Sequence, residues 1–236
     1  MRRLLLLSNS TSHGLGYLDH GIDEILDLLD GCPRILFVPF ALHDRAGYTE
    51  RFRRRMAKVG VGVDELVAGE PGRDALAGAE AVFVGGGNTF RLLRALERGG
   101  LLAPLRERAL AGLPYLGASA GINIAGPTIR TTNDMPIVEP RSFDALGLVP
   151  FQINPHYLDA ETASTHMGET REQRLIEFLE ENDRVVVGLR EGGWIRVAGS
   201  RGWLGGLRGA RVFRRGAPPE ERAVGAPLDD LLATDQ

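Results

Sequence analysis

The sequence predicts an α/β protein in which a mostly parallel sheet is covered by helices on both faces. Short apolar runs alternate with amphipathic stretches through residues 1–125, which is the order of strands and crossover helices in a parallel sheet. Most of these runs are apolar on successive residues, as expected of strands that are buried on both faces. Near the C-terminus, Gly-rich turns separate a few short apolar runs, which indicates antiparallel strands.

The first half of the chain supplies most of the expected sheet. Residues 4–7 are consecutive leucines, as in a buried strand, and the apolar residues of 18–29 recur on one helical face. The helix expected at 89–98 is followed by Gly99 and Gly100, which suit a C-cap. The other elements expected before residue 117 are strands at 35–38, 61–67, 81–84 and 114–116 and helices at 49–59 and 101–110.

The periodic pattern breaks between residues 126 and 155, where five prolines interrupt the chain. A long irregular stretch inside a compact domain is usually functional. Regular structure is expected again from residue 169, because Thr170 and Gln173 match a capping box at the start of a helix. The elements expected after that helix are a buried strand at 185–189 and short antiparallel strands at 194–197, 203–204 and 211–213.

The composition bounds the class of protein. A length of 236 residues suits one α/β domain spanning 1–236, whose Pro- and charge-rich end, 217–236, is expected to pack loosely. The net charge of −3 argues against nucleic-acid binding. Cys32 is the only cysteine and the histidines lack metal-ligand spacing, so neither a disulfide nor a metal site is expected. With no signal peptide or membrane span, we expect a cytoplasmic monomer or homodimer without cofactor or membrane partner.

Residues 117–121 read Gly-Ala-Ser-Ala-Gly, a G-x-S-x-G pattern. A short apolar run precedes the pattern and Ile122 follows it, so the context is strand, sharp turn and helix, as in a nucleophile elbow. Glycines permit the strained turn and keep side chains away from the serine. The Ser119 hydroxyl is then held at a helix N-terminus, where backbone N–H groups favour an oxyanion. In a glycine-rich chain, the pattern taken alone also fits an ordinary strand-to-helix turn.

A serine nucleophile needs a base and a group that orients the base. His156 is the favoured base because Pro155 stiffens the end of the irregular segment; a surface histidine is the alternative. Glu191 is the favoured acid, since it follows a buried strand and sites lie at the carboxyl ends of parallel strands. Asp134 is its rival, although it also suits a simple turn. The rival bases are His166, His13, His20 and His43.

The oxyanion donors are expected to be the backbone N–H of Ala120 and one from Gly86 or Gly87. The run of glycines ends a strand and opens a helix, and glycine allows close approach of the backbone to a ligand. A phosphate-binding loop at residues 85–89 is the alternative. It lacks the Lys-Ser/Thr pair of a P-loop and the spacing of G-x-G-x-x-G.

Several long segments resemble the peptidase E family of α-aspartyl dipeptidases, and the resemblance spans residues 3–213. It implies a flavodoxin-like sheet related to class I glutamine amidotransferases and a Ser-His-Glu triad, which falls on Ser119, His156 and Glu191. Two residues depart from the family pattern: Ala118 stands where tryptophan is frequent, and Gly193 where asparagine is frequent. The segments that carry the resemblance are residues 6–11, 84–90, 119–121, 128–138, 152–156 and 168–174.

The resemblance also implies the substrate, a small peptide of the type Asp-X with a free N-terminal aspartate. An aspartyl side chain requires a cation in the pocket. Arg171 is the first candidate because a guanidinium matches a carboxylate bidentately; a solvent-exposed helix arginine is the alternative. His166 and Arg130 are expected to assist, and Asp134 and Glu139 are candidates for holding the amino terminus.

Two other classes of protein remain open at this point. One is a different hydrolase on the same scaffold, such as a cyanophycinase-like β-aspartyl peptidase or an esterase. The other is a non-catalytic binding module with an amidotransferase-like fold. The joint presence of Ser119, His156 and Glu191 argues against the module, because a protein without catalysis has no chemical need for all of them.

Overall fold

The core of the protein is a seven-stranded sheet with the strand order β3-β2-β4-β5-β1-β8-β9. The computed structural model describes residues 1–160 and 168–233. The strands from β3 to β1 pair in parallel, whereas β8 and β9 are antiparallel and close the sheet beside β1. The strands are β1 (Arg3–Leu7), β2 (Arg34–Val38), β3 (Gly62–Glu65), β4 (Val82–Val84), β5 (Tyr115–Ala118), β8 (Gly193–Ala198) and β9 (Arg201–Gly206).

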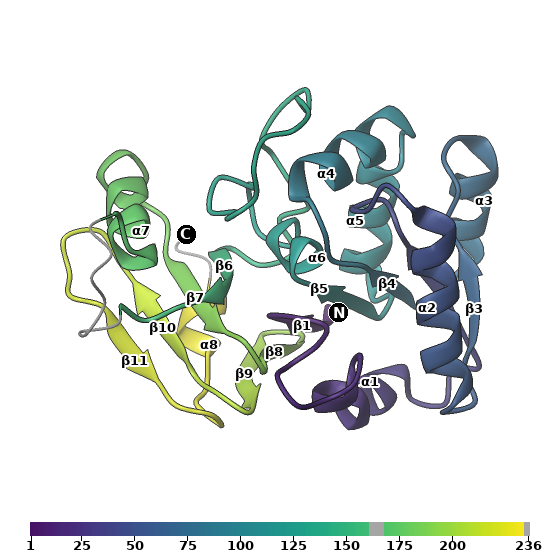
Figure 1. Ribbon diagram of the computed structural model, residues 1–236, viewed down its shortest axis with the longest axis horizontal. Helices are drawn as coiled ribbons and strands as arrows, with labels where there is room; N and C mark the ends of the chain where they lie inside the picture. Colours follow the sequence, from purple (N-terminus) through teal and green to yellow (C-terminus); the bar gives the residue numbers. More distant parts are fainter. Residues whose placement is uncertain (161–167, 234–236) are drawn as a thin grey trace.

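Helices cover both faces of this sheet (Figure 1). Along β1, Leu5 and Leu7 pack in the core that lies beneath α1 and α2. Leu4 and Leu6 face the opposite core, which α4, α5 and α6 cover. The expected α/β class, with its mostly parallel sheet, is therefore confirmed. These helices are α1 (Ile22–Leu29), α2 (Arg45–Ala57), α3 (Glu70–Gly78), α4 (Thr89–Arg98), α5 (Leu102–Ala111) and α6 (Ala120–Asn123).

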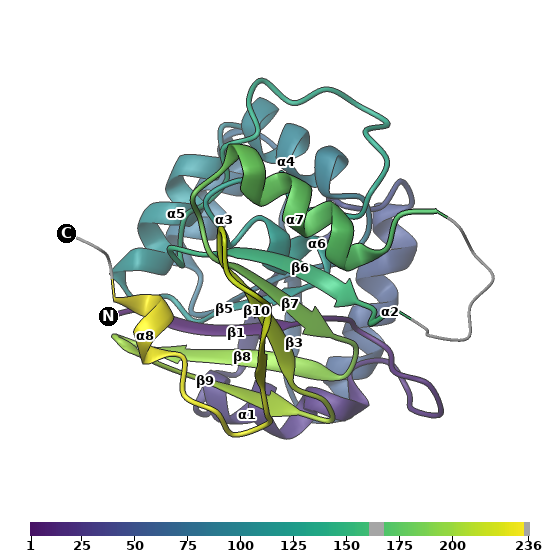
Figure 2. The same cartoon turned by 90° about the vertical axis from the view of Figure 1, so that its left-hand side faces the viewer.

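A second, four-stranded sheet has the order β11-β10-β7-β6. Its strands are β6 (Gln152–Tyr157), β7 (Val186–Arg190), β10 (Ala210–Phe213) and β11 (Glu220–Arg222), and α7 (Arg171–Glu181) packs on it (Figure 2). Strand β6 begins in the segment expected to be irregular. Its buried residues form no long apolar run, because they include Gln152 and Asn154, whose side-chain amide N–H groups donate to Thr128 and Thr131 inside the fold.

Some element boundaries differ from the expectation for local reasons. Helix α1 starts late because Leu18 has a left-handed backbone, with φ 62°, and a 3-10 turn precedes the helix. Helix α2 starts early because Asp44 caps it by accepting the Gly47 N–H. Helix α3 was not expected, since Leu76 is its only large buried side chain and no apolar stripe marks it.

The end of the chain packs more tightly than expected. Strand β11 pairs with β10, and the short helix α8 (Asp229–Leu232) lies against β9. Leu228, Leu231 and Leu232 are buried, and the Leu228 N–H donates to the Gly202 carbonyl at 2.7 Å. The expectation of a loosely packed end is therefore wrong for residues 220–233. The prediction was based on the many charged residues of this stretch and gave no weight to its few leucines, which are the residues that pack.

Between α6 and β6, a long segment crosses the top of the molecule in Figure 1 without helix or strand. It is not loose: Ile129, Leu146, Leu148 and Val149 are buried in the core beneath α4 and α5. Among the helices of the described residues, none is long and apolar enough to cross a membrane.

Candidate active site

Ser119 lies on a strained turn between β5 and α6. Its backbone has φ 53° and ψ −110°, a region that a non-glycine residue seldom adopts. The neighbouring glycines are required by backbone packing: a Cβ on Gly117 would lie 2.6 Å from the Gly121 carbonyl oxygen, and one on Gly121 would overlap the Val84 carbonyl. This packing is a further reason for glycine, beside the expected one of keeping side chains away from the serine. The sharp turn itself matches the expected nucleophile elbow.

The Ser119 hydroxyl meets the imidazole of His156. Ser119 Oγ lies 2.8 Å from His156 Nε2, and His156 Nδ1 lies 2.7 Å from Glu191 Oε1. His156 projects from β6 and Glu191 from the turn between β7 and β8. The structure therefore brings together the serine, histidine and glutamate selected from the sequence, in the geometry of a nucleophile, a base and an orienting acid.

The route to this geometry differs from the one expected. Strand β7 belongs to the small sheet, so Glu191 does not follow a strand of the large parallel sheet. His156 lies within a strand and not on a loop end, and its φ of 54° is also positive. The site is thus formed where the ends of β5 and β1 in the large sheet meet the ends of β6 and β7 in the small one.

The rival candidates lie elsewhere. The Asp134 carboxylate accepts hydrogen bonds from the Thr89 N–H at 2.8 Å and the Thr89 hydroxyl at 2.6 Å, at the N-terminus of α4. Both nitrogens of His156 are already engaged by Ser119 and Glu191, so Asp134 is not the acid bound to this histidine. His13 and His43 are exposed, and burial lowers the pKa of His20. His166 lies outside the described residues.

The glycines after β4 approach the nucleophile closely. A Cβ on Gly86 would lie 3.1 Å from the Ser119 Cβ, and one on Gly87, whose φ is 136°, would lie 2.7 Å from the Ala41 carbonyl oxygen. The buried Tyr48 hydroxyl lies against the backbone of Gly86. The N–H groups of Gly87 and Ala120 donate to no protein acceptor among the described residues, which leaves both available to an oxyanion.

Arg171 is the first residue of α7 and reaches toward the same region. Its Nη1 donates to Asn133 Oδ1 at 2.6 Å, and Asn133 Nδ2 donates to the carbonyl of Pro155, next to His156, at 2.7 Å. Within residues 1–160 and 168–233, Arg171 forms no ion pair with a carboxylate. Burial lowers its pKa, with Arg174 adding to the effect and Asp134 opposing it. A half-buried cation without a carboxylate is suited to binding an anion.

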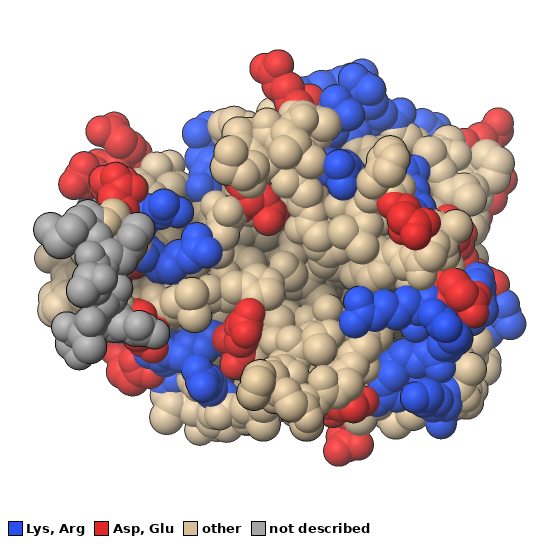
Figure 3. All heavy atoms as spheres, in the orientation of Figure 1, with Lys and Arg blue, Asp and Glu red and all other residues tan. Residues whose placement is uncertain are grey.

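Arg130 and Asp134 line one cavity of about 440 Å³, bounded by α4, α7 and the long segment between α6 and β6. Arg130 is exposed, and its guanidinium lies 4.9 Å from the centre of the Phe143 ring. Figure 3 shows a hollow between α7 and the rest of this face, with Lys and Arg side chains on its α7 side. Arg171, Arg130 and Asp134, which were expected to bind substrate, therefore lie on one side of the site. This side is formed by α7 and the long segment between α6 and β6.

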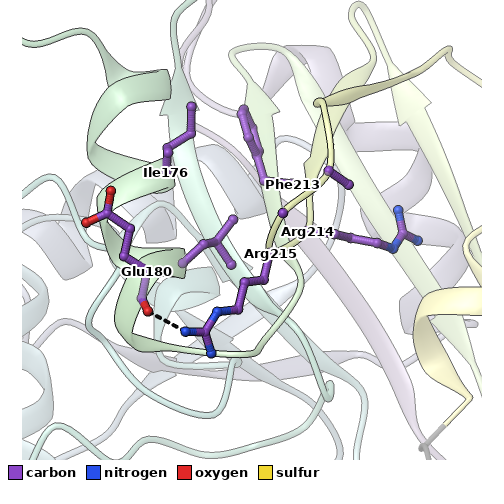
Figure 4. A pocket seen from close by; sticks show the side chains of 8 residues that line it. Ile176, Glu180, Phe213, Arg214 and Arg215 are labelled. Carbon is purple, nitrogen blue, oxygen red and sulfur yellow. Dashed lines mark hydrogen bonds between the residues drawn. The ribbon is translucent and has the colours of Figure 1, made fainter.

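Another hollow, of about 590 Å³, lies between α7 and the end of β10 (Figure 4). Ile176 and Phe213 form part of its wall, and Arg215 donates to the main-chain oxygen of Glu180 at 2.7 Å. It contains none of the candidate site residues. Its larger volume therefore does not identify it as the substrate site, because no candidate catalytic or substrate-binding residue lines it.

Sequence reasoning missed two polar residues that touch this site. Ser8 and Asn9 follow β1 directly and are almost completely buried. The His156 N–H donates to Ser8 Oγ at 2.9 Å, and the Gly192 N–H donates to Asn9 Oδ1 at 2.8 Å. The available signal was their position, because polar residues immediately after a buried parallel strand lie at the edge where sites form.

Comparisons with known proteins identify the family. The model of peptidase family S51 matches residues 4–204. The chain is 59% identical to a protein named Peptidase E from Streptomyces coelicolor, over 97% of this chain and 94% of the relative. It is 49% identical to a probable alpha-aspartyl dipeptidase from Drosophila melanogaster, over 98% of each chain. A crystal structure of a putative peptidase E from Listeria monocytogenes, 25% identical, matches with a TM-score of 0.67 over 88% of this chain and 99% of that one.

The fold and the site thus define a serine peptidase on an α/β scaffold. The chain belongs to peptidase family S51. The resemblance to peptidase E, first drawn from separate segments of the sequence, is confirmed over nearly the whole chain.

Proposed function

We propose that this protein is an α-aspartyl dipeptidase that cleaves Asp-X peptides through a triad of Ser119, His156 and Glu191. The observation that carries the proposal is the continuous chain of contacts from Ser119 Oγ to His156 Nε2 at 2.8 Å and from His156 Nδ1 to Glu191 Oε1 at 2.7 Å. The names of the relatives support the substrate class, since two of them are Peptidase E and a probable alpha-aspartyl dipeptidase.

In this mechanism, Ser119 Oγ attacks the carbonyl carbon of the substrate's aspartyl residue while His156 Nε2 takes the hydroxyl proton. Glu191 accepts the hydrogen bond from His156 Nδ1, which fixes the tautomer and stabilises the imidazolium. The same histidine then protonates the leaving amine, so that the peptide bond breaks and an acyl-enzyme remains. A water that gives its proton to His156 hydrolyses this ester and releases free aspartate.

The tetrahedral intermediate carries a negative oxygen that needs donors. The Ala120 N–H follows the nucleophile, and the Gly87 N–H lies on the glycine turn beside it. Both lack a protein acceptor among the described residues. Each preorganised donor of this kind contributes about 2.7–4 kcal/mol to stabilising the transition state. Gly86 is the less suitable donor of the two glycines, because the Tyr48 hydroxyl lies against its backbone.

Selectivity for aspartate is assigned to Arg171. Its guanidinium is partly desolvated and donates a hydrogen bond to the Asn133 side chain. Asn133 in turn donates to the carbonyl of Pro155, the residue before His156, so Asn133 links Arg171 to the catalytic histidine. A substrate carboxylate would supply the anion that the described residues do not. A site built around a buried charge rejects substrates that leave the charge unpaired. Asp-X should therefore be cleaved far better than an uncharged dipeptide.

The test is a substrate panel of Asp-Leu, β-Asp-Leu, Ala-Leu and a simple acyl ester, each assayed for hydrolysis by the purified protein. The proposal predicts rapid release of free aspartate from Asp-Leu and little reaction with the other peptides. A preference for β-Asp-Leu would favour a β-aspartyl peptidase. Cleavage of the ester alone would indicate an esterase, and no reaction with any substrate would favour a binding module.

A further inference from the structure

The catalytic residues of the proposed function are divided between two sheets. Ser119 follows β5 of the large sheet, whereas His156 and Glu191 belong to β6 and the end of β7 in the small one. Hydrogen bonds between their side chains require the two sheets to be held in register within a fraction of an ångström. The last residue of β1, in the large sheet, and the two residues that follow it contact the backbone of all three regions.

The first contact involves the nucleophile. The Ser119 N–H donates to the carbonyl of Leu7, the last residue of β1, at 3.1 Å. The next residue along the chain, Ser8, then crosses to the small sheet. Its hydroxyl donates to the Leu189 carbonyl of β7 at 2.8 Å and accepts the His156 N–H of β6 at 2.9 Å.

Ser8 therefore occupies a break in the ladder between β6 and β7. Pro155 pairs with Leu189 and Tyr157 pairs with Arg190, so His156 is the extra residue of a bulge. At this bulge, the Ser8 hydroxyl bridges a donor on β6 to an acceptor on β7, in place of a direct backbone hydrogen bond. A bulge redirects the side chain of its extra residue, and here that side chain is the imidazole that contacts Ser119.

Asn9 makes the corresponding contact on the acid's side. Its Oδ1 accepts the N–H of Gly192, which follows Glu191 and has φ 82°. Its Nδ2 donates to the Thr11 carbonyl at 2.9 Å and to the Ser12 hydroxyl at 3.1 Å, so the amide cannot rotate without losing hydrogen bonds. Ser8 and Asn9 thus hold the backbones of the base and the acid to the strand that also holds the nucleophile.

We propose that Ser8, assisted by Asn9, is the positioning residue of this active site: its hydroxyl completes the β6 bulge and so aims His156 at Ser119. The inference rests on the proposed function for its catalytic readout. Neither residue touches the substrate or the reacting atoms in this account. Their loss should therefore reduce the rate of the chemical step and leave recognition of the aspartyl group intact.

The test compares Ser8→Ala with Thr49→Val. Thr49 is an equally buried hydroxyl, but it bonds to the Arg45 carbonyl within α2, away from the triad. Ser8→Ala is expected to lower kcat on Asp-Leu about 100-fold, as a small misplacement of catalytic groups does. It should slow inactivation by a serine-directed phosphonate to a similar extent, with KM unchanged. Thr49→Val should keep wild-type values for both rates.

A spectroscopic measurement distinguishes a change in the orientation of His156 from a general loss of folding stability. In the wild type, the His156 Nδ1 proton bonded to Glu191 should give a downfield proton NMR signal, which Ser8→Ala should weaken or abolish and Thr49→Val should retain. Asn9→Ala is a second variant. It should reduce kcat and the NMR signal as Ser8→Ala does, because Asn9 holds the backbone next to Glu191. The inference is overturned if folded Ser8→Ala and Asn9→Ala match Thr49→Val in kcat and phosphonate rate, or if KM alone changes.

The reaction with the phosphonate tests the positioning role of Ser8 independently of whether Asp-Leu is the substrate. A wild type that reacts with the phosphonate but ignores Asp-Leu would refute the substrate assignment, while the comparison of Ser8→Ala with Thr49→Val would still decide the positioning role. A wild type that reacts with neither compound would overturn both proposals.

Discussion

Arg171 is the residue on which substrate choice depends in this account. We expect Arg171→Ala to lower kcat/KM on Asp-Leu by about 10- to 100-fold, which corresponds to the loss of about 1.5–3 kcal/mol from a hydrogen bond to a charged group. Its slow reaction with Ala-Leu should not change. Steady-state assays with both dipeptides measure the ratio of kcat/KM for Asp-Leu to kcat/KM for Ala-Leu.

Arg174 offers a control on the same helix. It is exposed and lies 3.5 Å from the Glu169 carboxylate, an arrangement that contributes little energy. Arg174→Ala should leave the preference for Asp-Leu close to that of the wild type. If both substitutions altered the preference equally, the preference would be explained by positive charge near α7 in general, and not by a specific contact of Arg171 with the substrate.

The sequence was informative at this scale about the identity of the reactive residues, but not about their supports. Ser119 could be found from its local pattern, and His156 and Glu191 from their positions after Pro155 and after a buried strand, on which the family resemblance then agreed. Ser8 could not, because its role depends on a hydroxyl that bridges two strands distant in sequence. The departure at Gly193 has a structural reason: a Cβ there would lie 2.7 Å from the Arg208 carbonyl oxygen, so this turn has no room for asparagine without a shift.

At the scale of elements, the start of α7 controls the position of Arg171. Thr170 caps the helix by accepting the Gln173 N–H at 3.2 Å, and the Gln173 side chain accepts the Thr170 N–H at 2.7 Å. We expect Thr170→Ala to lower the free energy of unfolding by about 1 kcal/mol. Because the first turn frays, KM for Asp-Leu should rise more than kcat falls. Urea unfolding and steady-state kinetics test the two effects separately.

Asp44 provides a matched cap on a different helix. It accepts the Gly47 N–H at 2.9 Å at the start of α2. Asp44→Ala should cost a similar amount of stability and leave KM unchanged. An equal rise in KM for both variants would show that α7 has no particular part in substrate binding.

Element prediction succeeded where patterns are local. The capping box of α7 and helix α4 were both found at their observed starts. Strand β6 was missed because its buried polar residues and internal proline interrupt any apolar run. The Asn154 amide N–H and the Ile153 carbonyl find their hydrogen-bond partners on Thr131, in the segment after α6. Such long-range satisfaction of polar groups leaves no periodic trace in the sequence.

At the scale of the whole molecule, the chain's end secures the edge strand β9. Leu228 is completely buried, and its N–H bonds to Gly202 of that strand. We expect Leu228→Ala to lower the free energy of unfolding by about 2–5 kcal/mol, through lost contacts and the cavity left behind. Chemical denaturation followed by circular dichroism measures the loss.

Val224 is the control, because 49% of its surface is exposed although it lies only a few residues away. Val224→Ala should change stability by less than about 0.5 kcal/mol. A mild effect of Leu228→Ala, comparable to that of Val224→Ala, would mean that the end of the chain packs as loosely as its composition first indicated.

The division of the molecule into two sheets could not be predicted from the sequence. Strands at 185–189 and 211–213 were expected, but nothing in their composition separates a strand of the small sheet from one of the large sheet. Which sheet a strand joins is decided by pairings between distant segments. The site depends on that choice, because it forms where the two sheets meet.

The central claim is that Ser119 acts as the nucleophile on an aspartyl substrate, and its most direct test is mass spectrometry after reaction with a serine-directed phosphonate. We predict a single adduct on the peptide that contains Ser119, slowed by excess Asp-Leu but not by Ala-Leu, and absent from Ser119→Ala, which should also release no aspartate from Asp-Leu. An adduct on another serine, or aspartate release by Ser119→Ala at the wild-type rate, would contradict the account.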